Sequence, residues 1–228
     1  LIAIGLIMSW WTTRINETLP PSRRLAAPKI KAYLIAYKMM LLNGRFMIYV
    51  LIKALGIAML YAYISSGPFI LQDHYHFSAL EFGLIFGTNA LACTLGAAVA
   101  PRFHIEKQAM VTGVLGMFLF SLALAAQMWF DWPFFLYELI ALPMLFFLGL
   151  IFSSSNTLAM DVGRSEAGTS SAILGVVKYI LAAIVSPLCG IGNMLHSTAL
   201  TMVATALIAL FFAILAYRLA PLADMVRK

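Results

Sequence analysis

Long apolar runs alternate with short polar gaps along this chain, and the positive charges fall in every second gap. Of the 15 Lys and Arg residues, only Lys53 and Lys178 lie inside the apolar runs. Lys and Arg are retained on the cytoplasmic side of a membrane during insertion, so gaps with and without them mark its two sides. The pattern predicts a multi-pass membrane protein whose C-terminus is cytoplasmic. Its helices would contact the lipid bilayer, which is therefore an expected partner.

The apolar runs have the length of transmembrane helices. The composition is 63% hydrophobic and 11% charged, whereas a soluble domain averages about 25% charged residues. A spanning helix needs about 20 apolar residues, and the runs are apolar on all sides, unlike the alternating strands of a barrel. We expect an all-α integral membrane protein with six spans. They cover about 46–71, 80–100, 109–130, 133–160, 168–191 and 198–217.

The six runs define a transmembrane bundle over 46–220, with a cytoplasmic tail over 221–228. The first apolar run, within 1–12, is too short to cross a membrane. It is not preceded by basic residues, as a signal peptide would be. We interpret it as the end of one more transmembrane helix, in a chain that continues a longer protein.

A basic linker over 13–45 separates this short run from the bundle. Prolines interrupt its first half. Over 29–44 apolar residues recur at helical spacing with lysines on another face, which predicts an amphipathic helix at the cytoplasmic interface. Asn43-Gly44 is a typical end for such a helix.

Several function classes find no support in the residues. The net charge of +6 follows from loop residues that set topology, so no nucleic-acid partner is expected. The four histidines are scattered over different loops, which argues against a metal site. No catalytic set of nucleophile, base and acid converges, so we do not expect an enzyme.

Short segments throughout the chain carry a family resemblance. In chain order they are Leu42-Asn43-Gly44-Arg45-Phe46, Ala62-Tyr63-Ile64-Ser65-Ser66-Gly67-Pro68, Glu81-Phe82-Gly83-Leu84, Asn156-Thr157-Leu158-Ala159-Met160 and Ala167-Gly168-Thr169-Ser170-Ser171. Together they resemble the C-terminal half of a major facilitator superfamily drug:proton antiporter of the Bcr/CflA and MdfA-like family. The resemblance is incomplete: only part of the family's loop motif remains near Pro101 to Lys107, and Lys178 stands where the family has glutamine.

The resemblance implies a fold and a function. The fold would be the second half of a twelve-span transporter in a bacterial inner membrane, with an N-terminal six-helix half as partner. The function would be export of small amphipathic drugs by alternating access. Export would be driven by the proton gradient, and no cofactor is expected. Two alternatives stay open: a superfamily carrier of a non-drug metabolite, and a half-transporter component that does not transport by itself.

Lys178 is the first candidate for a residue of the transport pathway. It lies near the middle of its run, where a charge costs about 2.5–3.5 kcal/mol on insertion scales. We therefore expect it to face the bundle interior or a water-filled cavity. A stripe of small residues on its face would let another helix approach. Lys178 would contact substrate or balance an acid in the other half, and a structural ion pair or a neutral buried amine is the alternative.

Glu138, Asn156 and Asn89 are the polar candidates on other runs. Glu138 could reach the outer interface or act as a pathway carboxylate that exchanges protons or pairs with a cation. Asn156 falls on the same helical face as Glu138. Asn89 is central in its run, where an interhelical hydrogen bond is the simpler role.

Lys53 and Tyr63 complete the candidate set. Lys53 is near the cytoplasmic end of its run, so we interpret it as snorkelling to the interface. Tyr63 precedes Ser65-Ser66-Gly67-Pro68, where the missing backbone donor of Pro68 should loosen the helix. An aromatic residue beside such a segment suits a site for apolar substrates, and packing in the bundle is the more common alternative. Ser78 and Glu81 match a capping box, which gives Glu81 a structural role.

Overall fold

The structure is a computed structural model that describes residues 2–15 and 30–219, and all elements in these ranges are helical. The proline-containing half of the basic linker and the C-terminal tail over 221–228 lie outside the described residues. The all-α prediction is therefore confirmed over the described ranges.

The chain forms two compact units, Leu1–Leu34 and Ile35–Lys228. The first unit contains α1, Ile2–Thr12, a helix of 11 residues without a buried side chain. Helix α2, Ile30–Leu42, covers the predicted amphipathic segment, and Met40 is its only buried residue. Helix α2 ends where Asn43-Gly44 predicts.

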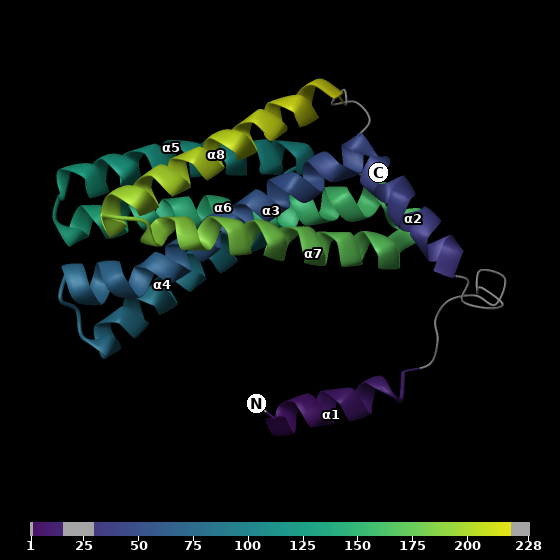
Figure 1. The fold of residues 1–228 in the computed structure, drawn as a ribbon, viewed down its shortest axis with the longest axis horizontal. Coiled ribbons are helices and arrows are strands. Elements are labelled where there is room, and N and C mark those ends of the chain that lie inside the picture. Colours follow the sequence, from purple (N-terminus) through teal and green to yellow (C-terminus); the bar gives the residue numbers. More distant parts are fainter. Residues whose placement is uncertain (1, 16–29, 220–228) are drawn as a thin grey trace. The chain divides into compact units, whose positions relative to one another are not determined.

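The second unit contains six helices that are long and apolar enough to cross a membrane (Figure 1). They are α3 Gly44–Pro68, α4 Ala79–Val99, α5 Glu106–Phe130, α6 Phe134–Val162, α7 Ala167–Val185 and α8 Met194–Leu219. A π-helical turn, Phe69–His74, extends α3, and 3₁₀ turns extend α4 and α7 at Ala100–Arg102 and Ser186–Gly190. The six predicted runs are confirmed to within a few residues at each end.

Local sequence signals set several of these helix ends. The Ser78 side chain accepts a hydrogen bond from the Glu81 backbone N–H, and the Glu81 carboxylate accepts one from the Ser78 backbone N–H. The predicted capping box is thus confirmed. Asn43 also caps α3, because its Oδ1 accepts from the Phe46 backbone N–H at 3.1 Å. The regular α-helical turns of α3 give way to π-helical ones directly after Pro68.

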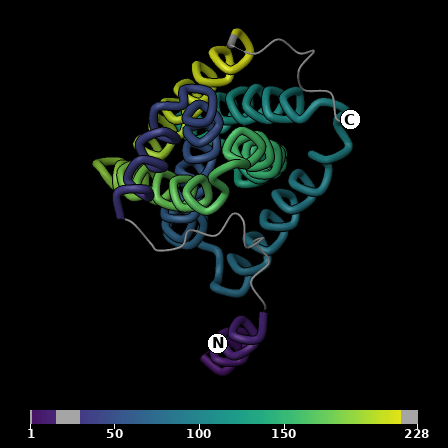
Figure 2. Tube along the Cα trace, turned by 90° about the vertical axis from the view of Figure 1, so that its right-hand side faces the viewer, coloured from purple at the N-terminus to yellow at the C-terminus, as the bar shows by residue number. Residues whose placement is uncertain are grey.

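Helices α3 and α6 form the centre of the bundle. Helix α3 packs against α6, α7 and α8, while α6 packs against α3, α4 and α5. Figure 2 shows α6 nearly along its axis, among the other helices of the bundle. Only 11% of the apolar window of α4 and 22% of that of α7 are buried, against 39–61% for the other four spans. Much of the surface of α4 and α7 is therefore not covered by the other described helices.

Glycines bring α4 and α6 into close contact. A Cβ atom on Gly96 would lie 1.9 Å from the Phe146 carbonyl oxygen, and one on Gly149 would lie 2.0 Å from the Cys93 carbonyl oxygen. Small residues permit such backbone contact between membrane helices. This contact sets how closely α4 lies against α6, and therefore where Asn89 of α4 lies relative to α6.

Candidate functional site

The six polar candidates lie on the four helices α3, α4, α6 and α7, and none lies on α5 or α8. The structure joins five of them by hydrogen bonds in two clusters. The outer cluster, toward the predicted external loops, contains Tyr63, Asn89 and Glu138. The inner cluster contains Lys53 and Asn156, with Lys178 nearby.

Asn89 is the centre of the outer cluster. Its Nδ2 donates to the Tyr63 hydroxyl at 2.7 Å and to Glu138 Oε2 at 3.3 Å, so it joins α3, α4 and α6. Asn89 and Tyr63 are buried, at 1% and 2% exposure, while Glu138 is half-buried. The interhelical hydrogen bond predicted for Asn89 is confirmed. Glu138 accepts a hydrogen bond from Asn89 within the bundle, and its role as a pathway carboxylate stays a prediction.

A cavity of about 420 Å³ opens beside this cluster. Its lining contains the polar residues Tyr63, Asn89 and Thr94 and is otherwise mainly apolar, including Phe86 and Leu145. The Phe86 ring stacks on the Tyr63 ring, with centroids 5.2 Å apart. A mainly apolar pocket with a few convergent polar groups is typical of a small-molecule site.

The inner cluster joins α3 to α6. Lys53 Nζ donates a hydrogen bond to Asn156 Oδ1, and both residues are half-buried. Lys53 thus has a polar acceptor on α6, and its snorkelling to the interface stays a prediction. Sequence spacing gives the depth of a lysine but not the partner that a neighbouring helix offers.

Lys178 approaches the inner cluster from α7. Its Nζ lies 4.7 Å from the centroid of the Tyr179 ring, and that ring meets the Tyr61 ring of α3, with centroids 6.4 Å apart. Its small-residue stripe is open at Gly168 and Gly175, where an added Cβ would meet nothing within 4 Å. Within the described residues, this stripe does not hold a neighbouring helix at those two positions.

Sequence reasoning missed two buried residues that belong to the polar interior. Tyr137 is fully buried beside Glu138 in the chain, and its hydroxyl has no hydrogen-bond partner among the described residues. Lys107 is also fully buried; its Nζ donates to the Tyr217 carbonyl oxygen at 3.2 Å and lies over the Tyr217 ring. An aromatic residue next to a membrane carboxylate was the available signal for Tyr137. For Lys107, a cation that closely follows Glu106 in a cytoplasmic loop gives no hint of burial.

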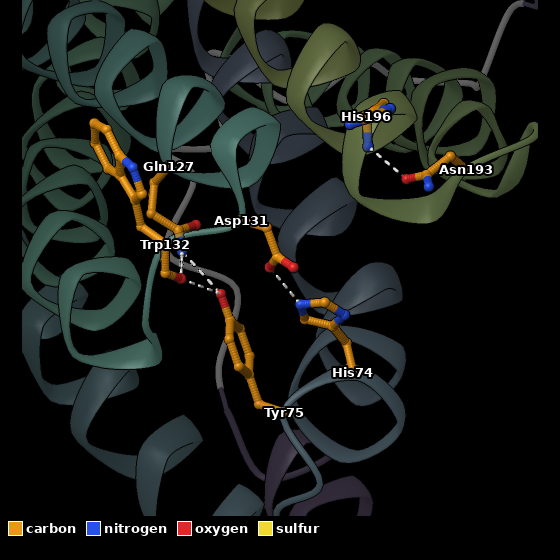
Figure 3. A network of polar contacts seen from close by, with 7 residues as sticks. All are labelled: His74, Tyr75, Gln127, Asp131, Trp132, Asn193 and His196. Carbon is orange, nitrogen blue, oxygen red and sulfur yellow. Dashed lines mark hydrogen bonds and ion pairs between the residues drawn. The ribbon is translucent and has the colours of Figure 1, made fainter.

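A second polar network joins the outer ends of the helices (Figure 3). His74 Nε2 contacts Asp131 Oδ1 at 2.7 Å. Gln127 Nε2 donates to the Tyr75 hydroxyl at 2.8 Å, and that hydroxyl donates to the Trp132 carbonyl oxygen at 3.1 Å. Burial raises the pKa of Tyr75 above its ordinary value. The network ties the loop after α3 to the loop after α5.

These arrangements differ in the chemistry that they can perform. The outer cluster presents one carboxylate beside neutral donors, which suits proton exchange or cation binding. The inner cluster presents ammonium groups and an amide, which suits an anion. Within residues 2–15 and 30–219, no three His, Cys, Asp or Glu side chains are placed to hold a metal ion.

Comparison with known proteins gives two matches. The chain matches the Major Facilitator Superfamily over residues 1–187. It is also 30% identical over 198 residues to a Bacillus subtilis (strain 168) protein, the uncharacterized MFS-type transporter YdgK. That alignment covers 85% of this chain and 49% of the relative, so the chain spans about half the length of the curated relative that it matches.

Proposed function

The chain belongs to the Major Facilitator Superfamily of membrane transporters, and we propose that it forms one half of a secondary transporter that exports small amphipathic compounds, drugs among them. Export would use the proton gradient across a bacterial cytoplasmic membrane. A second six-helix half would complete the pathway, and the two halves would rock about a site near the middle of the membrane.

The observation that carries this proposal is the distribution of polar residues in the bundle. Both clusters lie on α3, α4, α6 and α7, and two of these helices, α4 and α7, are the least buried of the six. Polar side chains within a membrane face a bundle interior or a water-filled cavity because exposure to lipid is unfavourable. A face of the bundle that carries polar side chains and is little covered by other helices is suited to close against a second half around a substrate.

Each of these residues would have a separate role in transport. Glu138 would exchange the coupling proton, with Asn89 holding the carboxylate in place through Nδ2. Tyr63 and Phe86 would contact the apolar part of a substrate, because both line the cavity beside Asn89. Pro68 and the π-helical turn after it would let the outer end of α3 move.

Proton flux in proteoliposomes tests the proposal. The transporter containing this chain should acidify or alkalinise the lumen when an amphipathic drug is added, and Glu138→Gln should abolish this flux while drug exchange without a gradient continues. Leu139→Gln changes the neighbouring exposed position and serves as the control. Equal proton flux in the wild type and in Glu138→Gln would refute the role of Glu138. Absence of any drug-coupled flux would refute proton-coupled drug export.

A carrier of a non-drug metabolite is the second candidate, and the lysines of the inner cluster favour it. Two cations on one face would repel positively charged drugs. Growth under drug challenge separates the two functions, since only an exporter of drugs should protect the cell. In either case this chain by itself should not transport, and transport without a second half would contradict the half-transporter interpretation.

A further inference from the structure

We propose that Lys53, Lys178 and Asn156 form a binding site for the carboxylate of a small organic anion. The site is assembled from α3, α7 and α6, and it gives the transporter a preference for amphipathic acids. The inference rests on the proposed function in one respect only, that this face of the bundle lines a transport pathway.

The two lysines need a negative charge that the described residues do not supply. Each ammonium belongs to a helix that is long and apolar enough to cross a membrane, where a charge is costly unless it is paired. Among the described residues, neither lysine forms an ion pair. The lone-pair oxygen of Asn156 and the ring of Tyr179 provide neutral contacts only. The pair therefore retains uncompensated positive charge.

Glu138, the carboxylate deepest in the spans, is too distant to neutralise the lysines. It lies 18 positions before Asn156 on α6, which corresponds to about 27 Å at 1.5 Å per residue. Its Oε2 is also engaged by Asn89. At the cytoplasmic end of α6, Asp161 contacts Arg164 at 2.8 Å. Glu138 is thus out of reach of Asn156, and Asp161 is already paired with Arg164.

The donor groups of the inner cluster match a carboxylate. Asn156 uses Oδ1 to accept from Lys53, and no described residue accepts from its Nδ2 group. Asn156 Nδ2 and the two ammonium groups are therefore three groups with N–H donors, contributed by α6, α3 and α7. A carboxylate offers two oxygens with about four lone-pair sites, and hydrogen bonds from charged donors to it are about twice as strong as neutral ones.

Aromatic rings beside the lysines suit the apolar part of the ligand. Tyr179 follows Lys178 on α7 and is 55% exposed. Its ring meets the Tyr61 ring of α3 edge to face, with centroids 6.4 Å apart. A ligand with an aromatic body and one carboxylate would satisfy both the charge and the apolar surface.

Two sources could supply a carboxylate: a free organic acid, or an acidic side chain of a segment outside this sequence. Binding of 2-naphthoate and its neutral isostere 2-naphthamide to the intact transporter in nanodiscs distinguishes them. A free site should bind naphthoate at least about tenfold more tightly than naphthamide, the value of one hydrogen bond to a charged group. A site filled by another acidic side chain should bind both equally.

Variants of the three residues test the assignment. Lys53→Gln and Lys178→Gln should each weaken naphthoate binding about tenfold and leave naphthamide binding unchanged. Asn156→Asp keeps the side-chain shape but places a carboxylate against Lys53, so it should abolish the preference. Lys178→Arg should keep it. Lys38→Gln removes an exposed charge on α2 and is the matched control.

Equal wild-type affinity for naphthoate and naphthamide would overturn the proposal, as would a preference that survives both glutamine substitutions. The result of this binding test can be distinguished from the result of the drug-export test. Drug-coupled proton flux without a preference for naphthoate would contradict the anion site alone. A preference that depends on the lysines, without any drug-coupled flux, would support the anion site and contradict proton-coupled drug export.

Discussion

At the scale of single residues, the outer cluster offers a direct measure of coupling between helices. Tyr63→Phe removes the hydroxyl that accepts from Asn89, and Glu138→Gln removes the charge on the other side of the same amide. Hydrogen bonds between membrane helices average about 0.6 kcal/mol, with a maximum near 1.7. A double-mutant cycle on the unfolding free energy should therefore give a coupling energy of about 0.5–1.5 kcal/mol.

The control pairs Tyr61→Phe with Glu138→Gln. Tyr61 contacts Tyr179 rather than Asn89, so its effect should simply add to that of the glutamate substitution. A coupling energy of zero for the Tyr63 pair would show that Asn89 does not link the two side chains.

Lys178 provides a second prediction at this scale. Lys178→Leu should make insertion of α7 more favourable by about 3 kcal/mol, because lysine is disfavoured and leucine favoured at the centre of a spanning helix. Glycosylation mapping of the inserted fraction of the isolated α7 segment measures this change. Lys178→Arg should leave the fraction unaltered. An unchanged fraction in Lys178→Leu would place the lysine near the interface instead.

The candidate residues could be chosen from the sequence because charged and amide groups are rare and costly inside a membrane. Their partners could not be chosen in the same way. Asn89, Tyr63 and Glu138 come from three helices, and only the tertiary structure shows that Asn89 lies between the other two. Lys53 illustrates the limit, because its depth favours the interface while Asn156 offers a closer acceptor.

At the scale of helices, the contact between α4 and α6 depends on glycine. Gly96→Ala would place a methyl group 1.9 Å from a carbonyl oxygen of α6, so the helices must separate. The expected loss is about 1–3 kcal/mol of stability, measured as a lower thermal unfolding temperature in detergent. Gly87→Ala on the same helix is the matched control, since its added Cβ meets nothing within 4 Å.

The control should be neutral or slightly stabilising, because alanine is a better helix former than glycine by about 0.5–1 kcal/mol. Equal unfolding temperatures for both alanine variants would show that the close contact of α4 with α6 does not determine stability.

Helix positions and several helix ends could be predicted because their determinants are local. The capping box at Ser78 and Glu81 and the cap at Asn43 act over three residues. The role of Gly96 could not be recognised locally, because its neighbours Phe146 and Gly149 lie about 50 residues away in the sequence.

At the scale of the whole molecule, the account predicts the orientation of the chain. A reporter active only in the cytoplasm should be active after Arg102 and inactive at Asp131, because the basic loops are retained inside. Alkaline phosphatase fusions at the same two positions should give the opposite result. Phosphatase activity at Arg102 would invert the topology and the assignment of inner and outer clusters with it.

The most direct test of the central claim is cysteine labelling of the intact transporter after Cys93 and Cys189 are replaced by serine. The account predicts that single cysteines at Asn156 and Lys178 react with a water-soluble maleimide and are protected by substrate. Cysteines at Leu119 of α5 and Phe211 of α8, which are about as exposed in the bundle as Tyr179, should remain unlabelled in lipid. Labelling of α5 and α8 with no reaction at Asn156 and Lys178 would contradict a pathway lined by α3, α4, α6 and α7.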